Sequence, residues 1–317
     1  MQIKFLDATP RPCDTIVWAA RFSHRSHDRS SPESDRELFL KLAKWGHWSA
    51  FEFNRWTVLV RCESLQDWRN LTSFLGNTAG WELSPFGSES VVLSGNARTL
   101  LDSNHEIAKN IRQILAKERR LDWGWISSPQ ESWQLHIPHV AARQTWDLYL
   151  PDGTNVLPIE ERAKHWAFLI AVHRVSRVLT HQLVRHRRCS FMQESLRYVD
   201  VSDGAGFVTP PSVYRSPHPE LYEGACQVAW GIYATLRQHK IPAQDARYVL
   251  PMGTHSAIVV LASLRQWAHI CRQRLSPKAQ WEIRNFVNGV YGELAARVPW
   301  WKDYLGDITK EVDTAGG

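Results

Sequence analysis

The chain has 317 residues, of which 44% are hydrophobic and 22% charged, which excludes disordered and fibrous proteins and fits a folded globular one. Its net charge is +6 with a pI of about 9.1, which suits partners that carry phosphate. The N-terminus lacks a signal-peptide stretch, no apolar window would span a membrane, and the five cysteines form no CxxC pair. We therefore expect a cytoplasmic protein without a disulfide framework, a metal site or a membrane partner.

The first 61 residues predict a small mixed unit. Residues 2–7 are typical of a short strand, and residues 34–45 of an amphipathic helix that Gly46 ends. Residues 53–60 predict a second strand, because apolar and polar side chains partly alternate there.

The stretch from about residue 62 to residue 159 differs in composition. It is rich in Gly, Ser and Asn, contains a Trp-rich segment at 123–133, and predicts a helix at 104–120. Pro151-Asp152-Gly153 indicates a turn. We interpret 62–159 as an inserted subdomain, and 1–61 with 160–317 as the core into which it is inserted.

The remainder of the chain is dominated by helical patterns. Residues 160–187 predict one long helix or two in succession. The further segments expected to be helical or extended lie at 219–240, 242–249, 251–261 (extended), 264–274 and 277–297. Helices with a few strands predict the α+β class, with a small antiparallel sheet.

The densest polar cluster runs from Gln182 to Tyr198. It holds four arginines, a histidine, two serines and a tyrosine. Arginine offers a planar fork of donors that suits phosphate, so the cluster predicts either a solvated basic surface or a ligand site. Because an apolar helix precedes it and Phe191 and Met192 interrupt it, we favour a partly buried, ligand-filled site. A catalytic thiolate at Cys189, beside Arg188 and near His186, is an alternative that no motif supports.

Arg185-His186-Arg187, followed after seven residues by Ser195, resembles the RHR-x7-S signature of the flavin-dependent thymidylate synthases. Segments beginning at Ala19 and Gly46 resemble that family's AARxS and GHxS/TxFEH motifs. The segment 246–251 resembles its ARxxLP motif, and 263–284 its NARxLxxFLxLR helix with the AQWEIR continuation. The resemblance covers roughly residues 1–61 and 160–305.

The resemblance implies roles for individual residues. The residues that match flavin contacts are Ser23, His47, Ser49, Glu52, Arg185, His186, Arg187, Ser263, Arg265 and His269. Those that match contacts to the nucleotide are Gln182, Arg185, Gln193, Ser195, Leu196, Arg197, Arg247 and Arg274. Tyr198 is expected beside the nucleotide, and Arg274 at the pyrimidine ring, where its cation would stabilise developing negative charge.

The resemblance also implies the chemistry and the assembly. It implies FAD that is reduced by NADPH, and methylenetetrahydrofolate as the donor of one carbon to C5 of a uracil nucleotide. It implies a homotetramer in which subunits share the site. The expected substrate is dUMP or UMP, and family frequency alone favours dUMP.

The chain departs from the family pattern in four places. Phe53 replaces the histidine of FEH, Ser263-Leu264 replaces the first two residues of NAR, and Met192 replaces a polar residue. The fourth departure is the segment 62–159, in which Asn96-Ala97-Arg98 echoes the missing NAR. This echo is either a coincidence or a sign that the segment reshapes a ligand pocket.

A protein of another class is the alternative. A nucleotide-binding or nucleic-acid-binding protein on the same fold would have kept the arginines and lost catalysis. The chain has no run of five or more like charges, which argues against a stable nucleic-acid partner. Bound flavin in the purified protein would distinguish the enzyme from this alternative.

Overall fold

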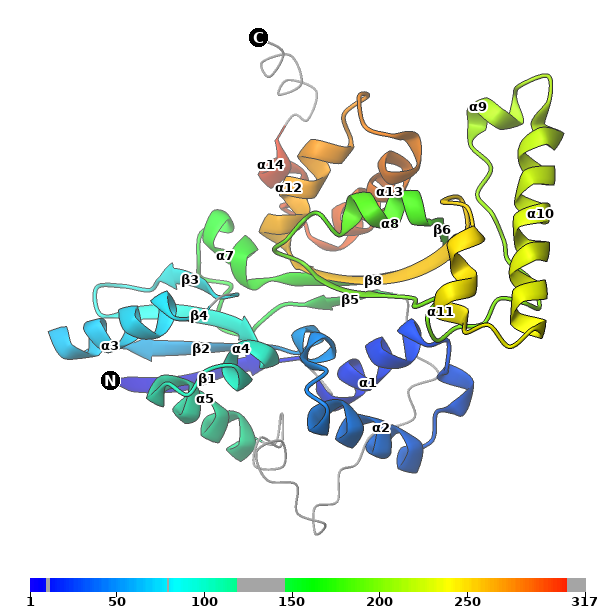
Figure 1. Cartoon of the computed structure of the whole chain (residues 1–317). Coiled ribbons are helices and arrows are strands. Elements are labelled where there is room, and N and C mark those ends of the chain that lie inside the picture. Colours follow the sequence, from blue (N-terminus) through cyan, green and yellow to red (C-terminus); the bar gives the residue numbers. More distant parts are fainter. Residues whose placement is uncertain (10–11, 79, 119–145, 307–317) are drawn as a thin grey trace.

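The structure is a computed structural model that describes residues 1–9, 12–78, 80–118 and 146–306 (Figure 1). The Trp-rich segment at 123–133 lies outside the described residues. Two four-stranded antiparallel sheets, each accompanied by helices, confirm the α+β class. The expected single small sheet is thus two sheets.

The first sheet is built from the N-terminal part of the chain. Its strands, in the spatial order β1-β2-β4-β3, are β1 (Gln2–Ala8), β2 (Arg55–Arg61), β4 (Ser90–Asn96) and β3 (Glu82–Pro85). The accompanying helices are α1 (Pro12–Ser23), η1 (His27–Arg29), α2 (Pro32–Lys44), η2 (Trp48–Phe53), α3 (Leu65–Gly76), α4 (Ala97–Leu101) and α5 (Glu106–Lys117). The strands predicted at 2–7 and 53–60 and the helices predicted at 34–45 and 104–120 are confirmed within a few residues at each end.

The boundary predicted at residue 61 is contradicted by the strand pairing. β4 pairs with β2 along its whole length, from Arg55 opposite Asn96 to Arg61 opposite Ser90. The run Val91-Val92-Leu93 is buried on both faces, as in an inner strand of a sheet. Residues 82–96 therefore complete the sheet begun by β1 and β2 and do not fold as a separate subdomain.

The second sheet is built from the C-terminal part. Its strands, in the spatial order β5-β6-β8-β7, are β5 (Trp146–Tyr149), β6 (Ala167–Ser176), β8 (His255–Ser263) and β7 (Ser190–Gln193). The helices are α7 (Ile159–His165), α8 (Arg177–Leu183), α9 (Pro211–Tyr214), α10 (Pro219–Gln238), α11 (Ala243–Ala246), η4 (Arg247–Val249), α12 (Leu264–Arg274), α13 (Trp281–Arg297) and α14 (Trp301–Leu305). The helices predicted at 219–240, 264–274 and 277–297 and the extended segment 251–261 are confirmed.

The helix or helix pair predicted at 160–187 is wrong in its middle, where β6 forms. The apolar run from Ala167 to Val172 is mostly buried because β6 is an inner strand between β5 and β8. Apolar side chains on both faces hide the alternation that identifies a strand, so the run resembles a helix in sequence. Ser176 ends the strand and caps α8, where its hydroxyl accepts a hydrogen bond from Leu179 N (3.1 Å).

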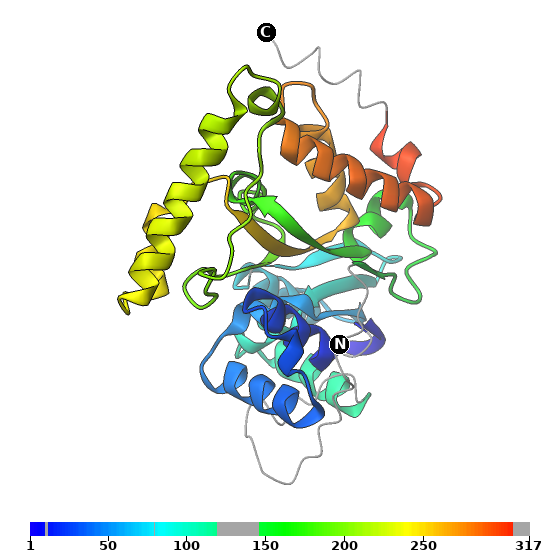
Figure 2. The ribbon, with the colours of Figure 1, turned by 90° about the vertical axis from the view of Figure 1, so that its right-hand side faces the viewer.

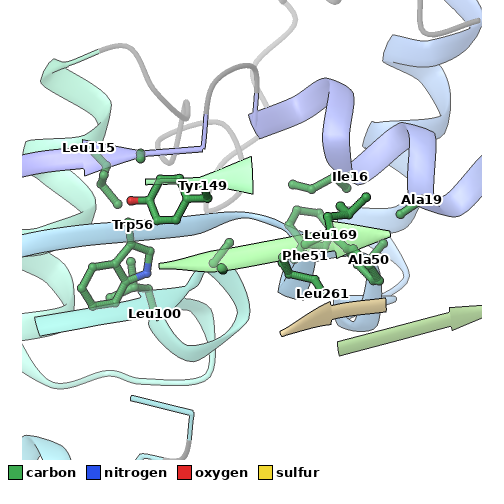
Figure 3. Close-up of a cluster of buried hydrophobic side chains, with 14 of the residues drawn as sticks. Ile16, Ala19, Ala50, Phe51, Trp56, Leu100, Leu115, Tyr149, Leu169 and Leu261 are labelled. Carbon is green, nitrogen blue, oxygen red and sulfur yellow. The ribbon is translucent and has the colours of Figure 1, made fainter. Parts of the chain in front are cut away.

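The main core joins both parts of the chain. Ile16 of α1 and Phe51 of η2 lie with Leu169 of β6 and Leu261 of β8 in one buried cluster (Figure 3). On the other face of the second sheet, Trp267 of α12 packs in a second cluster with α13 and α14. Figure 2 shows the N-terminal elements below and the C-terminal elements above, with the two sheets at the junction.

A buried histidine links the two parts. His165, at the end of α7, is fully buried. Its Nδ1 lies 2.7 Å from Ser94 Oγ of β4, and its Nε2 lies 2.8 Å from Ser84 Oγ of β3.

Among the described helices, none has the length and apolar character needed to cross a bilayer.

Candidate functional site

Three of the four arginines of the 182–198 cluster, Arg185, Arg187 and Arg188, line a cationic groove, whereas Arg197 does not. The groove is formed by the connection between α8 and β7 on one side and by α12 on the other. Its lining residues are Arg185, His186, Arg187, Arg188, Arg265, Gln266, His269, Arg272, Gln273 and Arg274. Six predicted residues, far apart in sequence, are thereby brought together: Arg185, His186, Arg187, Arg265, His269 and Arg274. We call this set of lining residues the cationic groove.

Arg274 and His186 form the best-defined pair in the groove. Arg274 Nε donates to His186 Nε2 at 3.2 Å, and Arg274 Nη2 lies 3.4 Å from the carbonyl oxygen of Gln182. Because a guanidinium can only donate, His186 must be neutral with its proton on Nδ1. Burial, followed by the charges of Arg274 and His269, lowers the pKa of His186 to about 4, which agrees with this state.

The predicted nucleotide contacts after β7 lie against the end of α1. Ser195 N donates to the carbonyl oxygen of Ser23 at 2.9 Å, which brings two predicted residues together. The rings of His24 and Tyr198 lie edge to face, with their centroids 5.1 Å apart, and Tyr198 is exposed. Arg197 lies over the Tyr198 ring at 5.1 Å, whereas Leu196 is buried in a small apolar cluster. A buried Leu196 can only offer its backbone to a ligand.

Gln193 and Arg247 lie elsewhere. Gln193 Nε2 donates to Thr180 Oγ1 of α8 at 3.0 Å, and Gln193 does not line the groove. Arg247 is the first residue of η4 and lies near Arg177, which begins α8. The pKa of Arg177 is lowered first by burial and then by the charge of Arg247. The groove lies at the opposite end of α8. One chain therefore does not gather all the predicted nucleotide contacts in a single cavity.

One of the predicted flavin contacts at η2, Glu52, lines a second cavity, whereas His47 and Ser49 do not. His47 precedes η2, and Ser49 and Glu52 lie within it. Glu52 Oε1 accepts a hydrogen bond from Arg98 Nη1 of α4 at 2.6 Å. Glu52 lines a cavity of about 700 Å³ between the two sheets, together with Arg187, Arg188 and Ser263 of the C-terminal part. Arg187 and Arg188 line both this cavity and the cationic groove, so the two are neighbours.

Ser263 has a structural role in addition to its position at the cavity. It is the N-cap of α12, where its hydroxyl accepts a hydrogen bond from Gln266 N at 3.3 Å. The cap orients the first turn of α12, in which Arg265 lies 3.6 Å from Glu82 of β3. Serine therefore retains the capping function at the position where the resembled motif has asparagine.

Several lining residues were not predicted. In the cationic groove these are Arg188, Gln266, Arg272 and Gln273, and in the cavity they include Arg55, Trp81 and Arg98. Arg98 could have been identified from the sequence, because Asn96-Ala97-Arg98 resembles the NAR motif. Arg55, at the start of β2, and Trp81, just before β3, could not be identified, because they approach the C-terminal part only in three dimensions.

Nucleophilic catalysis by Cys189 is disfavoured. Burial raises the pKa of this thiol to about 12, so the reactive thiolate is absent near neutral pH.

Within the described residues, no group of three or more His, Cys, Asp or Glu side chains is placed to hold a metal ion. Fold and site thus define an α+β protein with an arginine-rich groove suited to a phosphate-bearing ligand.

Comparison with known proteins identifies the family. Residues 160–300 match the family model described as Thymidylate synthase complementing protein. The flavin-dependent thymidylate synthase of Thermococcus onnurineus is 31% identical over 181 residues, which cover 55% of this chain and 72% of that protein. That of Saccharolobus solfataricus is 38% identical over 164 residues, or 50% of this chain and 60% of that protein. The chain belongs to the flavin-dependent thymidylate synthase family.

Other alignments are shorter. The flavin-dependent thymidylate synthase of Geobacter sulfurreducens is 38% identical over 123 residues, which cover 38% of this chain and 53% of that protein. Several of these alignments thus span little more than half of the relative. A crystal structure of thymidylate synthase X from Helicobacter pylori with FAD and dUMP aligns at 18% identity with a TM-score of 0.39, over 49% of this chain and 80% of that one.

Proposed function

We propose that the protein methylates C5 of a uracil nucleotide, with dUMP as the leading substrate. The cationic groove is the observation that most supports this proposal. Four arginines that match the family's ligand contacts line it around a neutral histidine. Family membership and the relatives' names favour dUMP over UMP.

The groove and the neighbouring cavity have the chemistry that FAD requires. Arg185, Arg187 and Arg265 offer charged donors to its phosphates, and Ser263, Glu52 and His269 offer polar contacts. When bound, FAD would supply redox chemistry, with NADPH as its reductant and methylenetetrahydrofolate as the carbon donor. The chain itself binds and orients these groups and stabilises charge on the pyrimidine.

The protein's own contribution centres on Arg274. Its bond to His186 fixes the guanidinium, while burial and the neighbouring Arg185 lower its pKa, so additional negative charge near it would be stabilised. The neutral His186 accepts this bond without adding a second positive charge. The shared site and the homotetramer implied by the resemblance remain part of the proposal, since one chain leaves Arg247 and Gln193 outside the groove.

The proposal is tested by turnover with FAD, NADPH and methylenetetrahydrofolate, and with dUMP or UMP offered in parallel. We expect a purified protein with flavin absorbance and methylation of dUMP. Preference for UMP would keep the reaction class and change the substrate. A colourless protein that binds oligonucleotide and methylates neither nucleotide would refute the enzyme and favour the non-catalytic alternative.

Arg187→Ala is expected to release the flavin. Arg187 lines both the groove and the cavity, and loss of a charged hydrogen bond weakens binding by about tenfold to a hundredfold. The measurement is the FAD dissociation constant from fluorescence quenching. Arg284→Ala is the matched control, because Arg284 is a partly exposed arginine of α13 that lines neither the groove nor the cavity and donates to Pro277 O. Equal FAD affinity in both variants would remove Arg187 from the flavin site.

A further inference from the structure

The two sheets repeat one arrangement. Their spatial orders, β1-β2-β4-β3 and β5-β6-β8-β7, are the same when strands are counted from the start of each half. The pairing registers also agree. β2 begins with Arg55 opposite Asn96, and β6 begins with Ala167 opposite Ser263. The corresponding outer strands pair with equal stagger: Glu82 lies opposite Ser94, and Ser190 lies opposite Leu261.

The helix caps repeat as well. Ser64 follows Arg55 at the same interval as Ser176 follows Ala167, and each hydroxyl accepts a hydrogen bond at 3.1 Å from the backbone N–H three residues on. At the end of β4, Asn96 Oδ1 accepts a hydrogen bond from Thr99 N at 3.1 Å. At the end of β8, Ser263 Oγ accepts one from Gln266 N, again three residues on. Arg98 and Arg265 each follow two residues after the cap. Matching order, register and caps indicate that the chain contains one unit twice.

The loop before the outer strand differs between the two units. The N-terminal unit has Asn77-Thr78-Ala79-Gly80-Trp81 before Glu82, whereas the C-terminal unit has Arg185-His186-Arg187-Arg188-Cys189 before Ser190. Gly80 has a φ of +93°, and a Cβ there would lie 2.8 Å from Thr99 Cγ2, so a counterpart of Arg188 would not fit. The N-terminal unit therefore lacks the arginines of a second cationic groove.

The cavity between the sheets, which we call the seam pocket, is lined by equivalent parts of both units. Gly80, Trp81 and Asn96 line it from the N-terminal unit. Their counterparts Arg188, Cys189 and Ser263 line it from the C-terminal unit. The seam pocket thus lies where two copies of the unit face each other within one chain.

Three donor atoms of the N-terminal unit, on two residues, lack acceptors in the seam pocket. Arg55 Nε and Nη2 are buried without a hydrogen-bond partner among the described residues, as is Trp81 Nε1. Burial lowers the pKa of Arg55, and the opposing charges of Tyr149 and Glu82 offset this effect only in part. In the C-terminal unit, Ala167 occupies the position that corresponds to Arg55, and Cys189 the position that corresponds to Trp81. Neither of these residues offers a comparable side-chain donor. Buried donors without partners are costly unless a ligand supplies the acceptors.

The charges around the seam pocket favour an anion. Arg98 is already bonded to Glu52 and Asp102, and Glu82 lies 3.6 Å from Arg265. Arg187 and Arg188 form no ion pair with any residue that the structure describes. The lining holds four arginines (Arg55, Arg98, Arg187 and Arg188) and three carboxylates (Glu52, Glu82 and Asp102), which leaves an excess of one positive charge. The pocket's volume of about 700 Å³ is that of a nucleotide-sized ligand site.

We propose that the N-terminal unit supplies, within the same chain, one wall of a nucleotide site. In this site Arg55 and Trp81 donate to the phosphate-bearing part of the ligand opposite Arg187 and Arg188. The inference rests on the proposed function, because it takes FAD to be that ligand. It adds two donors from outside the RHR segment, and it gives the segment 62–159 a role in binding.

The test compares Arg55→Met and Trp81→Phe with Arg61→Met, a matched control at the exposed end of the same strand, using FAD and ADP as probes. We expect Arg55→Met to weaken FAD binding by at least about tenfold, and Trp81→Phe to weaken it less because one neutral donor is lost. Arg55→Met should also leave the ligand-free Tm unchanged or higher, since it removes a buried cation that Glu82 compensates only in part. A purely structural role for Arg55 would lower that Tm instead.

The outcomes separate the two proposals. Unchanged FAD affinity in both seam variants, together with flavin loss in Arg187→Ala, would overturn the seam site and leave the proposed function intact. Should Arg55→Met fail to fold, Trp81→Phe decides the question. Wild-type protein that binds ADP but not FAD would refute the flavin function, and loss of ADP binding in Arg55→Met would then support the seam site. Wild-type protein that binds neither probe would refute both.

Discussion

Replacing Arg274 by alanine is expected to reduce the turnover number by about a hundredfold to a thousandfold while FAD remains bound. Arg274 is fixed by its 3.2 Å bond to His186 and by the Gln182 carbonyl, so its guanidinium is already oriented before substrate binds. An oriented donor in a partly buried site stabilises charge in the transition state more strongly than mobile water does. The measurements are kcat, KM for the nucleotide, and the flavin absorbance of the purified variant.

Arg274→Lys separates the charge from the geometry. A lysine retains the cation but lacks the planar fork, so we expect turnover between that of wild type and that of Arg274→Ala. Arg284→Ala again serves as the control for the loss of an arginine outside the groove. Unchanged kcat in Arg274→Ala would remove this residue from the mechanism, and loss of flavin would reassign it to cofactor binding.

Local sequence signals identified most helices because their caps and apolar faces are encoded nearby. The helix at 264–274 was predicted with its bounds, and its cap Ser263 and apolar face lie within the segment itself. β6 was not found, because an inner strand is apolar on both faces and gives no alternation. The decision between helix and strand there depends on β5 and β8, which pair with it from distant parts of the sequence.

The site shows the same division. The RHR segment is contiguous, so Arg185, His186 and Arg187 could be predicted together. Arg55 and Trp81 could not, because they meet Arg187 and Arg188 only where β2 and β3 face the C-terminal unit. The predicted boundary at residue 61 had hidden the repeat, since it separated β2 from its partner β4.

His165 is the residue from which we expect the largest effect on pH-dependent stability. Both ring nitrogens face serine hydroxyls of the N-terminal unit, Ser94 at 2.7 Å and Ser84 at 2.8 Å. Burial, followed by the charges of Arg55 and Lys164, lowers its pKa to about 3, against a weaker opposing effect of Glu161. The neutral ring therefore joins the two units without a charge.

The sign of the pH dependence follows from the lowered pKa. The unfolded chain binds a proton at His165 near pH 6.5, whereas the folded protein binds it only near pH 3. The free energy of unfolding contributed by this group is complete above pH 6.5 and is lost as the pH falls toward 3. For one histidine the loss approaches about 1.4 kcal/mol per pH unit inside that window.

His165→Gln is expected to lower the free energy of unfolding by about 1–3 kcal/mol at pH 7, because one of the two serines loses its partner. It is also expected to flatten the decline in stability between pH 6.5 and pH 4.5 relative to wild type, since the titrating group is gone. Urea unfolding at several pH values measures both effects. His239→Gln, an exposed histidine at the end of α10, is the control and should reproduce the wild-type pH dependence. Parallel pH curves for wild type and His165→Gln would show that His165 does not govern the acid sensitivity of the junction between the two units.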